Sequence, residues 1–218
     1  KIHFMNKLCY VSLLLFLVFL LIGCSAEISV PHKPVSFSPE QALLTVYLTS
    51  SGVAEVARDI KIEELAIDSA GAWISLDLQH FTADFTQLRG QQQLLGVSAA
   101  PPGELRRLRL RVREAAEGGI RDYLLVLDKR LQLEKGQSRC LFLDWQIHTA
   151  QPGRLELQSR FSAHAQEDVL ASNLLYVACS EINTIYLVRL DSSQVVASFS
   201  VPGPLGTIRI QADQRRLY

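Results

Sequence analysis

The sequence predicts a mainly β protein: an antiparallel β-sandwich followed by one four-stranded propeller-like blade, with an N-terminal helical signal peptide in front. Three observations predict this. Segments between residues 42 and 165 alternate apolar and polar side chains with a period of two, which is typical of half-buried strands. Residues 174–218 hold four more strand candidates and begin to repeat after 42 residues. The chain opens with a basic residue, an apolar run and small residues.

Residues 1–23 have the organisation of a bacterial signal peptide. Met5 and Lys7 begin a short basic stretch, and the apolar run Leu8–Ile22 follows. A transmembrane helix needs about 20 apolar residues, so a membrane-spanning anchor is the less favoured alternative. Met5 fits the true start of translation, and the residues before it indicate an upstream remnant. We therefore expect the sequence to be a fragment.

The segment Leu21-Ile22-Gly23-Cys24 resembles the bacterial lipobox. The resemblance implies cleavage between Gly23 and Cys24 and attachment of lipid, with acyl chains such as palmitate, to the Cys24 thiol. Several chains make a durable anchor, because one chain alone gives only marginal membrane binding. Ser25 resembles the residue found at this position in lipoproteins sorted outward. We therefore expect a lipid-anchored protein of the cell envelope, in the outer membrane and facing the periplasm or the surface.

The part of the chain that follows cleavage is close to neutral. The full sequence has 22 basic and 22 acidic residues, but Lys1 and Lys7 precede Cys24, so the rest carries two more acids than bases. This balance gives no steering toward nucleic acid, and no nucleic-acid partner is expected. Residues 24–41 begin with the lipidated cysteine and contain Pro31, Pro34 and Pro39, which predict a tether without helix or paired strand.

Residues 42–165 are expected to form the β-sandwich domain. About seven short strands separated by Gly, Pro and charged turns are typical of this fold. A β-bulge is expected at Glu63-Glu64, and between Leu78 and Pro101 the pattern fits short helical turns that cover one sandwich edge. The expected strands are Leu44–Leu48, Ile60–Ile67, Ile74–Leu78, Leu108–Val112, Tyr123–Leu127, Leu141–Ile147 and Leu155–Phe161.

Several of these segments resemble one known family. Leu44–Thr49, Ser75–Leu78 and the step Pro102–Leu110 look like a bacterial lipoprotein domain of unknown function with a transthyretin-like or immunoglobulin-like sandwich. The resemblance covers residues 42–164 and departs at Ser50-Ser51-Gly52, where such domains often carry Asp-Ala-Pro. It implies a fold and a location, and no activity.

Residues 174–218 are expected to be the first, truncated repeat of a β-propeller. The strand candidates are Leu174–Cys179, Ile185–Leu190, Val195–Val201 and Thr207–Gln211, and the opening Leu175-Tyr176 begins again at Leu217-Tyr218. The segment resembles the YVTN propeller repeat, from which it departs at Cys179-Ser180 and Gln214. Repeat folds need about three units for stability, so the protein is expected to continue. The alternative is two hairpins that complete the sandwich.

One strand has an unusual charge pattern. Arg107, Arg109, Arg111 and Arg113 alternate with apolar residues, so a strand here carries one basic face. Four guanidinium groups in a row could grip a polyanion such as surface polysaccharide or lipid phosphate. The favoured alternative is a solvated face paired with acids on neighbouring strands. The candidate acids are Glu63, Glu64, Asp122 and Asp128.

Two thiols remain after lipidation, at Cys140 and Cys179. They could form a disulfide in an oxidising compartment, but their strand-like apolar surroundings favour two buried free thiols. The histidines and cysteines lack metal-ligand spacing, and no nucleophile elbow or phosphate-binding loop occurs. The sequence therefore predicts no catalytic residue, no metal site and no cofactor.

The leading functional hypothesis is a non-enzymatic binding or scaffold protein, anchored on the membrane through Cys24, whose sandwich holds a propeller clear of the membrane. Propellers commonly present loops to a partner, here a protein or a polysaccharide. One alternative is a lipid-anchored enzyme with its active site in the missing part of the propeller. Another is an envelope adhesin that uses the arginine strand.

Overall fold

The computed structural model describes residues 38–51, 58–78, 81–115, 118–151, 154–166, 173–201 and 203–206. All of them belong to one compact unit, Val35–Tyr218. The predicted signal peptide, the lipidation site Cys24 and most of the tether lie outside the described residues. In the part of the chain that is described, no helix has the length and apolar character that a bilayer span requires.

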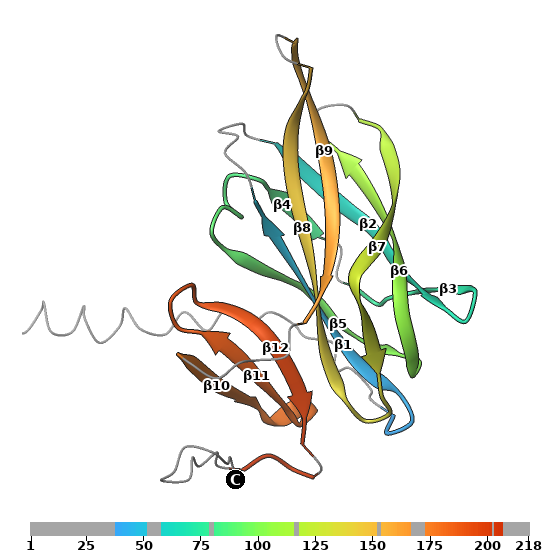
Figure 1. The fold of residues 1–218 in the computed structure, drawn as a ribbon, viewed down its shortest axis with the longest axis vertical. Helices are drawn as coiled ribbons and strands as arrows, with labels where there is room; N and C mark the ends of the chain where they lie inside the picture. The colour runs from blue at the N-terminus through green and yellow to red at the C-terminus, as the bar shows by residue number, and fades with distance from the viewer. Residues whose placement is uncertain are drawn as a thin grey trace, which may run out of the picture. The chain divides into compact units, whose positions relative to one another are not determined.

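The described residues are almost entirely β-structure (Figure 1). A single 3₁₀ turn, η1 (Ser180–Ile182), interrupts the strands near the carboxyl end. The strands are β1 (Ala42–Ser50), β2 (Asp59–Ser69), β3 (Ala72–Ser75), β4 (Phe81–Asp84), β5 (Gln92–Ala100), β6 (Gly103–Glu114), β7 (Ile120–Leu133), β8 (Ser138–Gln151), β9 (Arg154–Ala165), β10 (Leu174–Cys179), β11 (Thr184–Arg189) and β12 (Gln194–Ser200). The prediction of a mainly β protein is confirmed.

Strands β1 to β9 form one curled sheet in the order β3-β2-β6-β7-β9-β8-β1-β5, with β4 also paired to β2. Most neighbours are antiparallel, but β1 runs parallel to β8 over Leu43–Ser50, and β7 meets β9 in a parallel pairing at Leu127. The expectation of a wholly antiparallel sandwich was therefore wrong for these two pairings. Parallel neighbours need long connections, and residues 51–137 provide the connection between β1 and β8.

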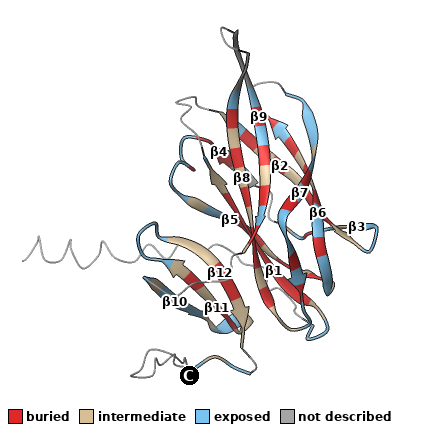
Figure 2. Cartoon of the chain, viewed as in Figure 1, coloured by how far each residue is buried: buried red, intermediate tan, exposed pale blue. Residues whose placement is uncertain are grey.

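The inner face of the curled sheet holds a large apolar core (Figure 2). Trp145 of β8 lies at its centre with no exposed surface. Its ring meets Phe85 edge-on at 5.1 Å between centroids and stacks on Phe161 at 6.1 Å. Aromatic pairs of this geometry are worth about 0.5–1.5 kcal/mol beyond the area they bury. The core therefore fixes β8 and β9 against the turn that follows β4.

The bulge expected at Glu63-Glu64 is confirmed. Ile62 lies opposite Val112 and Glu64 lies opposite Arg111, so Glu63 is the extra residue of β2. The insertion shifts the alternation by one position, and Ile60 and Ile62 before it and Leu65 and Ile67 after it all reach the core. The even-numbered pair before the bulge and the odd-numbered pair after it therefore lie on the same face of the sheet.

The expectation of helical cover between Leu78 and Pro101 was largely wrong. Only residues 85–88 form a turn, closed by a hydrogen bond from Leu88 N to Asp84 O at 3.2 Å. Residues 92–100 are strand β5, which pairs with β1 along its length at the edge of the sheet. The glutamine-rich sequence has little strand propensity of its own, and pairing with the buried strand β1 overrides it.

Strands β10, β11 and β12 form a separate antiparallel sheet in simple up-and-down order, which we call the small sheet. Its strands match three of the four predicted for residues 174–218 within one residue. They pair with one another and do not extend the curled sheet. The choice between a propeller repeat and hairpins that complete the sandwich stays a prediction. The fourth predicted strand, Thr207–Gln211, and the restart at Leu217-Tyr218 lie outside the described residues.

Candidate binding surfaces

The small sheet packs on the outer face of β1 and β8. The Thr45 and Tyr186 hydroxyls share a hydrogen bond of 3.2 Å, and those of Ser138 and Ser198 share one of 2.9 Å. Thr45, Ser138 and Ser198 are almost fully buried, and burial raises the pKa of Tyr186 to about 12. Strand β1 is therefore covered on both faces, by the core on one side and by the small sheet on the other.

Two glutamines join the sheets by contacting the backbone of β12. The Gln166 Oε1 atom accepts hydrogen bonds from Cys140 N at 2.7 Å and from Ser198 N at 3.2 Å. Gln92 of β5 bonds both the N–H and the C=O of Val195. Among the described strands β12 lies at the edge of the small sheet, and an open edge exposes unpaired backbone groups to other chains. Side chains of the larger sheet occupy part of this edge.

Both cysteines of the described part are free thiols. Cys140 is completely buried at the junction of the two sheets, and burial raises the pKa of its thiol to about 12. Cys179 at the end of β10 is half-buried. This arrangement agrees with the favoured interpretation of two free thiols, and a Cys140–Cys179 disulfide stays a prediction.

The four arginines predicted as a polyanion contact lie side by side on β6, and each has a carboxylate partner. Arg113 Nε donates to Glu63 at 2.9 Å and Arg111 Nε donates to Asp122 at 2.8 Å. The remaining pairs are Arg107 with Asp68, Arg109 with Glu64 at 3.4 Å, and Arg111 with Glu64 at 3.2 Å. Three of the four acids expected as partners are therefore used, while Asp128 pairs with His164 at 3.4 Å.

These pairs neutralise the basic face of β6. The hydrogen bond from Arg111 lowers the pKa of the Asp122 carboxyl, and those from Arg113 and Lys61 lower the pKa of the Glu63 carboxyl. Such exposed pairs contribute little to stability, because both charges are well solvated. The face is an alternating array of opposite charges, so the attraction for a polyanion expected from four free arginines is much reduced.

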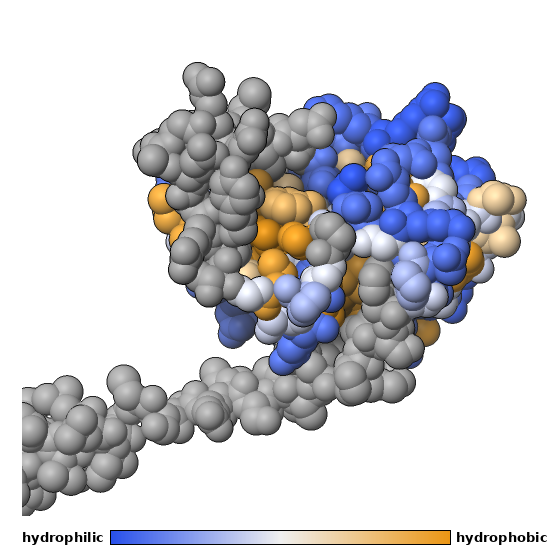
Figure 3. All heavy atoms as spheres, turned by 90° about the horizontal axis from the view of Figure 1, so that it is seen from below, coloured by the Kyte–Doolittle hydropathy of each residue, from blue (hydrophilic) through white to orange (hydrophobic). Residues whose placement is uncertain are grey.

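Apolar side chains border the arginine strand on both sides. Trp73 of β3 is 38% exposed, and the guanidinium carbons of Arg109 and Arg107 lie 5.5 and 6.0 Å from its ring centroid. On the opposite side Leu124 and Val126 of β7 are 62% and 67% exposed. The spacing between arginine and tryptophan is that of a cation–π contact. Figure 3, viewed from below, shows a different gathering of hydrophobic residues, toward the side on which Figure 1 draws the small sheet, while the side of β6 and β7 is largely hydrophilic.

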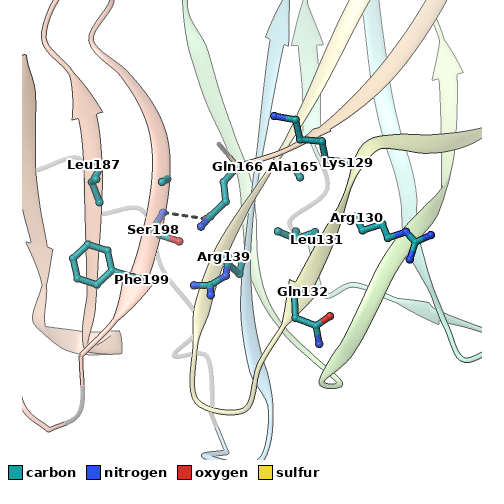
Figure 4. A pocket seen from close by; sticks show the side chains of 11 residues that line it. Lys129, Arg130, Leu131, Gln132, Arg139, Ala165, Gln166, Leu187, Ser198 and Phe199 are labelled. Carbon is teal, nitrogen blue, oxygen red and sulfur yellow. Dashed lines mark hydrogen bonds between the residues drawn. The ribbon is translucent and has the colours of Figure 1, made fainter. Parts of the chain in front are cut away.

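A groove of about 460 Å³ lies between the β7–β8 hairpin and the small sheet (Figure 4). The two sheets line opposite sides of it. The hairpin and β9 supply Lys129, Arg130, Leu131, Gln132, Arg139, Ala165 and the adjoining Gln166, and the small sheet supplies Leu187, Ala197, Ser198 and Phe199. Its volume lies within the range of about 300–1,000 Å³ typical of small-molecule sites.

The charged side chains of this groove are all cationic. Arg130 pairs with Glu104 at 3.3 Å, and Figure 4 shows its side chain directed away from the small sheet. Arg139 donates to the carbonyl of Ser138 at 3.1 Å, and among the described residues neither Arg139 nor Lys129 has a carboxylate partner. Two cations beside an apolar wall attract an anion, because the low-dielectric wall strengthens their field.

This groove could not be predicted from the sequence. Its residues come from segments around 129–139, 165–166 and 187–199, which no local motif connects. Arg139 and Lys129 stand alone in sequence, whereas the arginines of β6 form a visible pattern that the neighbouring acids neutralise. The one available signal is the β7–β8 hairpin, since its close turn brings residues 129–132 near residue 139.

The described residues contain no group of three His, Cys, Asp or Glu side chains placed to hold a metal ion. His164 contacts Ser162 at 3.1 Å and Asp128 at 3.4 Å, but all three side chains belong to solvated strand surfaces. The histidine and hydroxyl lie on the same strand, two residues apart. We assign no catalytic role to this cluster.

No protein-family model and no curated protein matches the sequence. Among solved structures, the crystal structure of a "putative cell adhesion protein" from Bacteroides ovatus ATCC 8483 is similar to 59% of this chain, with 10% identity and a TM-score of 0.25. The match covers 47% of that protein, so this chain spans about half its length. A likeness this remote carries no argument about function.

Proposed function

We propose that this protein is a lipid-anchored envelope protein that acts as a binding and scaffold module. The observation that carries the scaffold role is the fastening of the small sheet to the outer face of β1 and β8. Buried hydroxyl pairs, such as Thr45 with Tyr186, and the glutamine bridges join the two sheets without pairing their strands. The small sheet is therefore held in a fixed position on the larger sheet. A protein that displays a binding surface needs such a fixed position.

The sequence supports the anchor. The Leu21–Cys24 segment has the residues that lipidation needs, at the end of an apolar run of suitable length. Strand β1 starts at Ala42, so residues 25–41 separate the lipid from the sandwich. On this proposal the lipid holds the protein in the outer membrane, and the sandwich faces the periplasm or the surface.

The propeller part of the proposal rests on the small sheet. Three antiparallel strands in up-and-down order are compatible with the first three strands of a propeller blade, and the spacing of the sequence restart lies in the range of one blade. Further repeats would then extend the display surface. The arginine-strand adhesin has less support, because every guanidinium of that strand has an acidic partner.

Fractionation of cells that express the full chain tests the anchor. Cys24→Ala should move the protein from the membrane fraction to the soluble fraction and abolish incorporation of radiolabelled palmitate. Cys9→Ala is the matched control, since it removes a thiol from the signal peptide and should leave both results unchanged. If the Cys24→Ala protein stays with the membrane, the lipid anchor is wrong.

The genomic reading frame tests the propeller. Further copies of the 42-residue unit should follow Tyr218 in the same frame. A stop codon directly after Tyr218 would contradict the propeller and leave the anchored sandwich untouched.

A further inference from the structure

We propose that the groove between the β7–β8 hairpin and the small sheet binds a carboxylated sugar of an acidic polysaccharide, with Arg139 and Lys129 holding the carboxylate. The proposal names a ligand class for the binding role given above and is independent of the lipid anchor. Three features of the groove carry it: two cations that have no carboxylate partner among the described residues, an apolar wall opposite an exposed amide, and an edge strand some of whose backbone groups already have partners.

The cations are the first feature. The four arginines of the arginine strand engage carboxylates. Among the residues that the structure describes, Arg139 and Lys129 have no carboxylate partner, and both line the groove. A carboxylate placed between them accepts charge-assisted hydrogen bonds, which are about twice as strong as neutral ones. The guanidinium of Arg139 can receive both carboxylate oxygens at once.

The wall is the second feature. Phe199 of the small sheet is half-buried and lines the groove beside the buried Leu187, and Gln132 on the hairpin side is exposed. A pyranose ring has C–H groups that pack on such a wall and hydroxyls that need both donors and acceptors. The primary amide of Gln132 supplies two donors and one acceptor group. An inorganic anion would contact only the cations and would make no contact with the apolar wall.

The third feature is the edge strand β12, whose backbone favours a sugar over a peptide as the ligand of the groove. An acidic peptide that docked beside β12 would gain most of its affinity by pairing with the strand backbone. Gln92 already bonds both backbone groups of Val195, and Gln166 already bonds Ser198 N, so three of the backbone groups that a docked peptide would use have partners. A sugar requires no such pairing. The side-chain chemistry of the groove therefore favours a saccharide.

Calorimetric titration of the full chain in detergent, at low salt, tests the proposal with three probes. Trigalacturonate carries carboxylated sugars, maltotriose is neutral, and pentaglutamate is an acidic peptide. We expect trigalacturonate to bind, maltotriose not to bind, and pentaglutamate to bind at least about tenfold more weakly than trigalacturonate. Higher salt should weaken the binding, because the attraction is between charges.

Variants locate the site. Arg139→Gln and Lys129→Gln should each weaken trigalacturonate binding by about tenfold, as expected for the loss of one hydrogen bond to a charged group. Arg113→Gln is the matched control, because it removes the same charge from a residue that pairs with Glu63 and does not line the groove, and it should leave affinity unchanged. Lys129 is exposed, so its variant decides the outcome if Arg139→Gln impairs folding.

Three results would overturn the proposal: no binding of trigalacturonate by the wild-type chain, equal affinity of the wild type and Lys129→Gln, or equal affinity for pentaglutamate. Each of them leaves the fractionation result for Cys24→Ala unchanged. Failure of the ligand assignment is therefore distinguishable from failure of the anchored scaffold.

Discussion

The side-chain amide of Gln92 hydrogen-bonds the backbone of Val195 in the manner of a neighbouring strand. Gln92 Nε2 donates to Val195 O at 3.1 Å, and Val195 N donates to Gln92 Oε1 at 2.8 Å. The two residues lie 103 positions apart and belong to different sheets. One side chain thus reproduces the paired donor and acceptor of a β-ladder where the strands themselves do not meet.

Gln92→Ala should loosen this junction. The change leaves both backbone groups of Val195 without their partner, and a half-buried unsatisfied pair costs about 1–3 kcal/mol of unfolding free energy. Amide hydrogen exchange at Val195 should accelerate, while exchange in β8 stays slow. Gln93→Ala, at the exposed neighbouring position, is the control and should change neither measurement. Unaltered exchange at Val195 would mean that the contact does not hold β12.

Trp145 should be the most costly single truncation of the core. Trp145→Ala removes a side chain with no exposed surface, and a cavity of this kind typically costs about 3–5 kcal/mol in urea unfolding. Trp145→Phe should cost much less, because the indole N–H has no hydrogen-bond partner to lose. Trp73→Ala is the comparison, since Trp73 is 38% exposed and its loss leaves no cavity. Equal costs for the two alanine variants would contradict this core.

The stability of the fold should fall in alkali. Burial raises the pKa of the Cys140 thiol from 9.0 to about 12, so the unfolded chain loses this proton at lower pH than the folded one. The unfolding free energy should hold steady below pH 9 and decline between pH 9 and 12, by at most about 1.4 kcal/mol per pH unit for each such group.

Variants of the two cysteines separate this contribution. Cys140→Ala should flatten the first part of the alkaline decline, from pH 9 to 10, while Cys179→Ala should retain it because Cys140 is still present. The buried hydroxyl of Tyr186 contributes later, since its pKa is raised from 10.0 to about 12. A Cys140→Ala protein with an unchanged decline would show that the thiol is exposed in solution.

The ion pairs of the arginine strand predict a local change in titration. Arg113→Gln removes the main hydrogen bond to the Glu63 carboxyl, so the pKa of Glu63 should rise toward its ordinary value in an NMR titration. Arg107→Gln is the control, because Arg107 pairs with Asp68 and should leave Glu63 unchanged. If the pKa of Glu63 does not move in Arg113→Gln, the pair does not persist in solution.

Local patterns in the sequence predicted much of the fold. Alternation along β6 and β7 located these strands, and the change of parity between Ile62 and Leu65 located the bulge. The cross-strand acids Glu63, Glu64 and Asp122 were also identifiable, because charges on adjacent strands tend to pair. These features depend on near neighbours in sequence or on simple chemical complementarity.

Long-range pairing could not be predicted in the same way. Thr45 and Tyr47 interrupt an apolar run, which indicates a strand with one solvated face. In the structure that face is covered by the small sheet, whose residues follow more than a hundred positions later in the sequence. The strand propensity of β5 is weak, and only its partner β1 makes it a strand. The groove has the same origin, because Arg139 and Phe199 meet only when the two sheets dock.

The position of β1 has a mechanical consequence. Strand β1 lies between β5 and β8, antiparallel to one and parallel to the other, and it is the first strand of the fold. A pull on the residues before Ala42 acts along the axis of β1 and loads the hydrogen bonds on both sides together, in shear. Bonds loaded in this way must break as a group, whereas bonds of a peeled strand break in turn. A pull through the proposed tether is thus resisted by both neighbours of the first strand together.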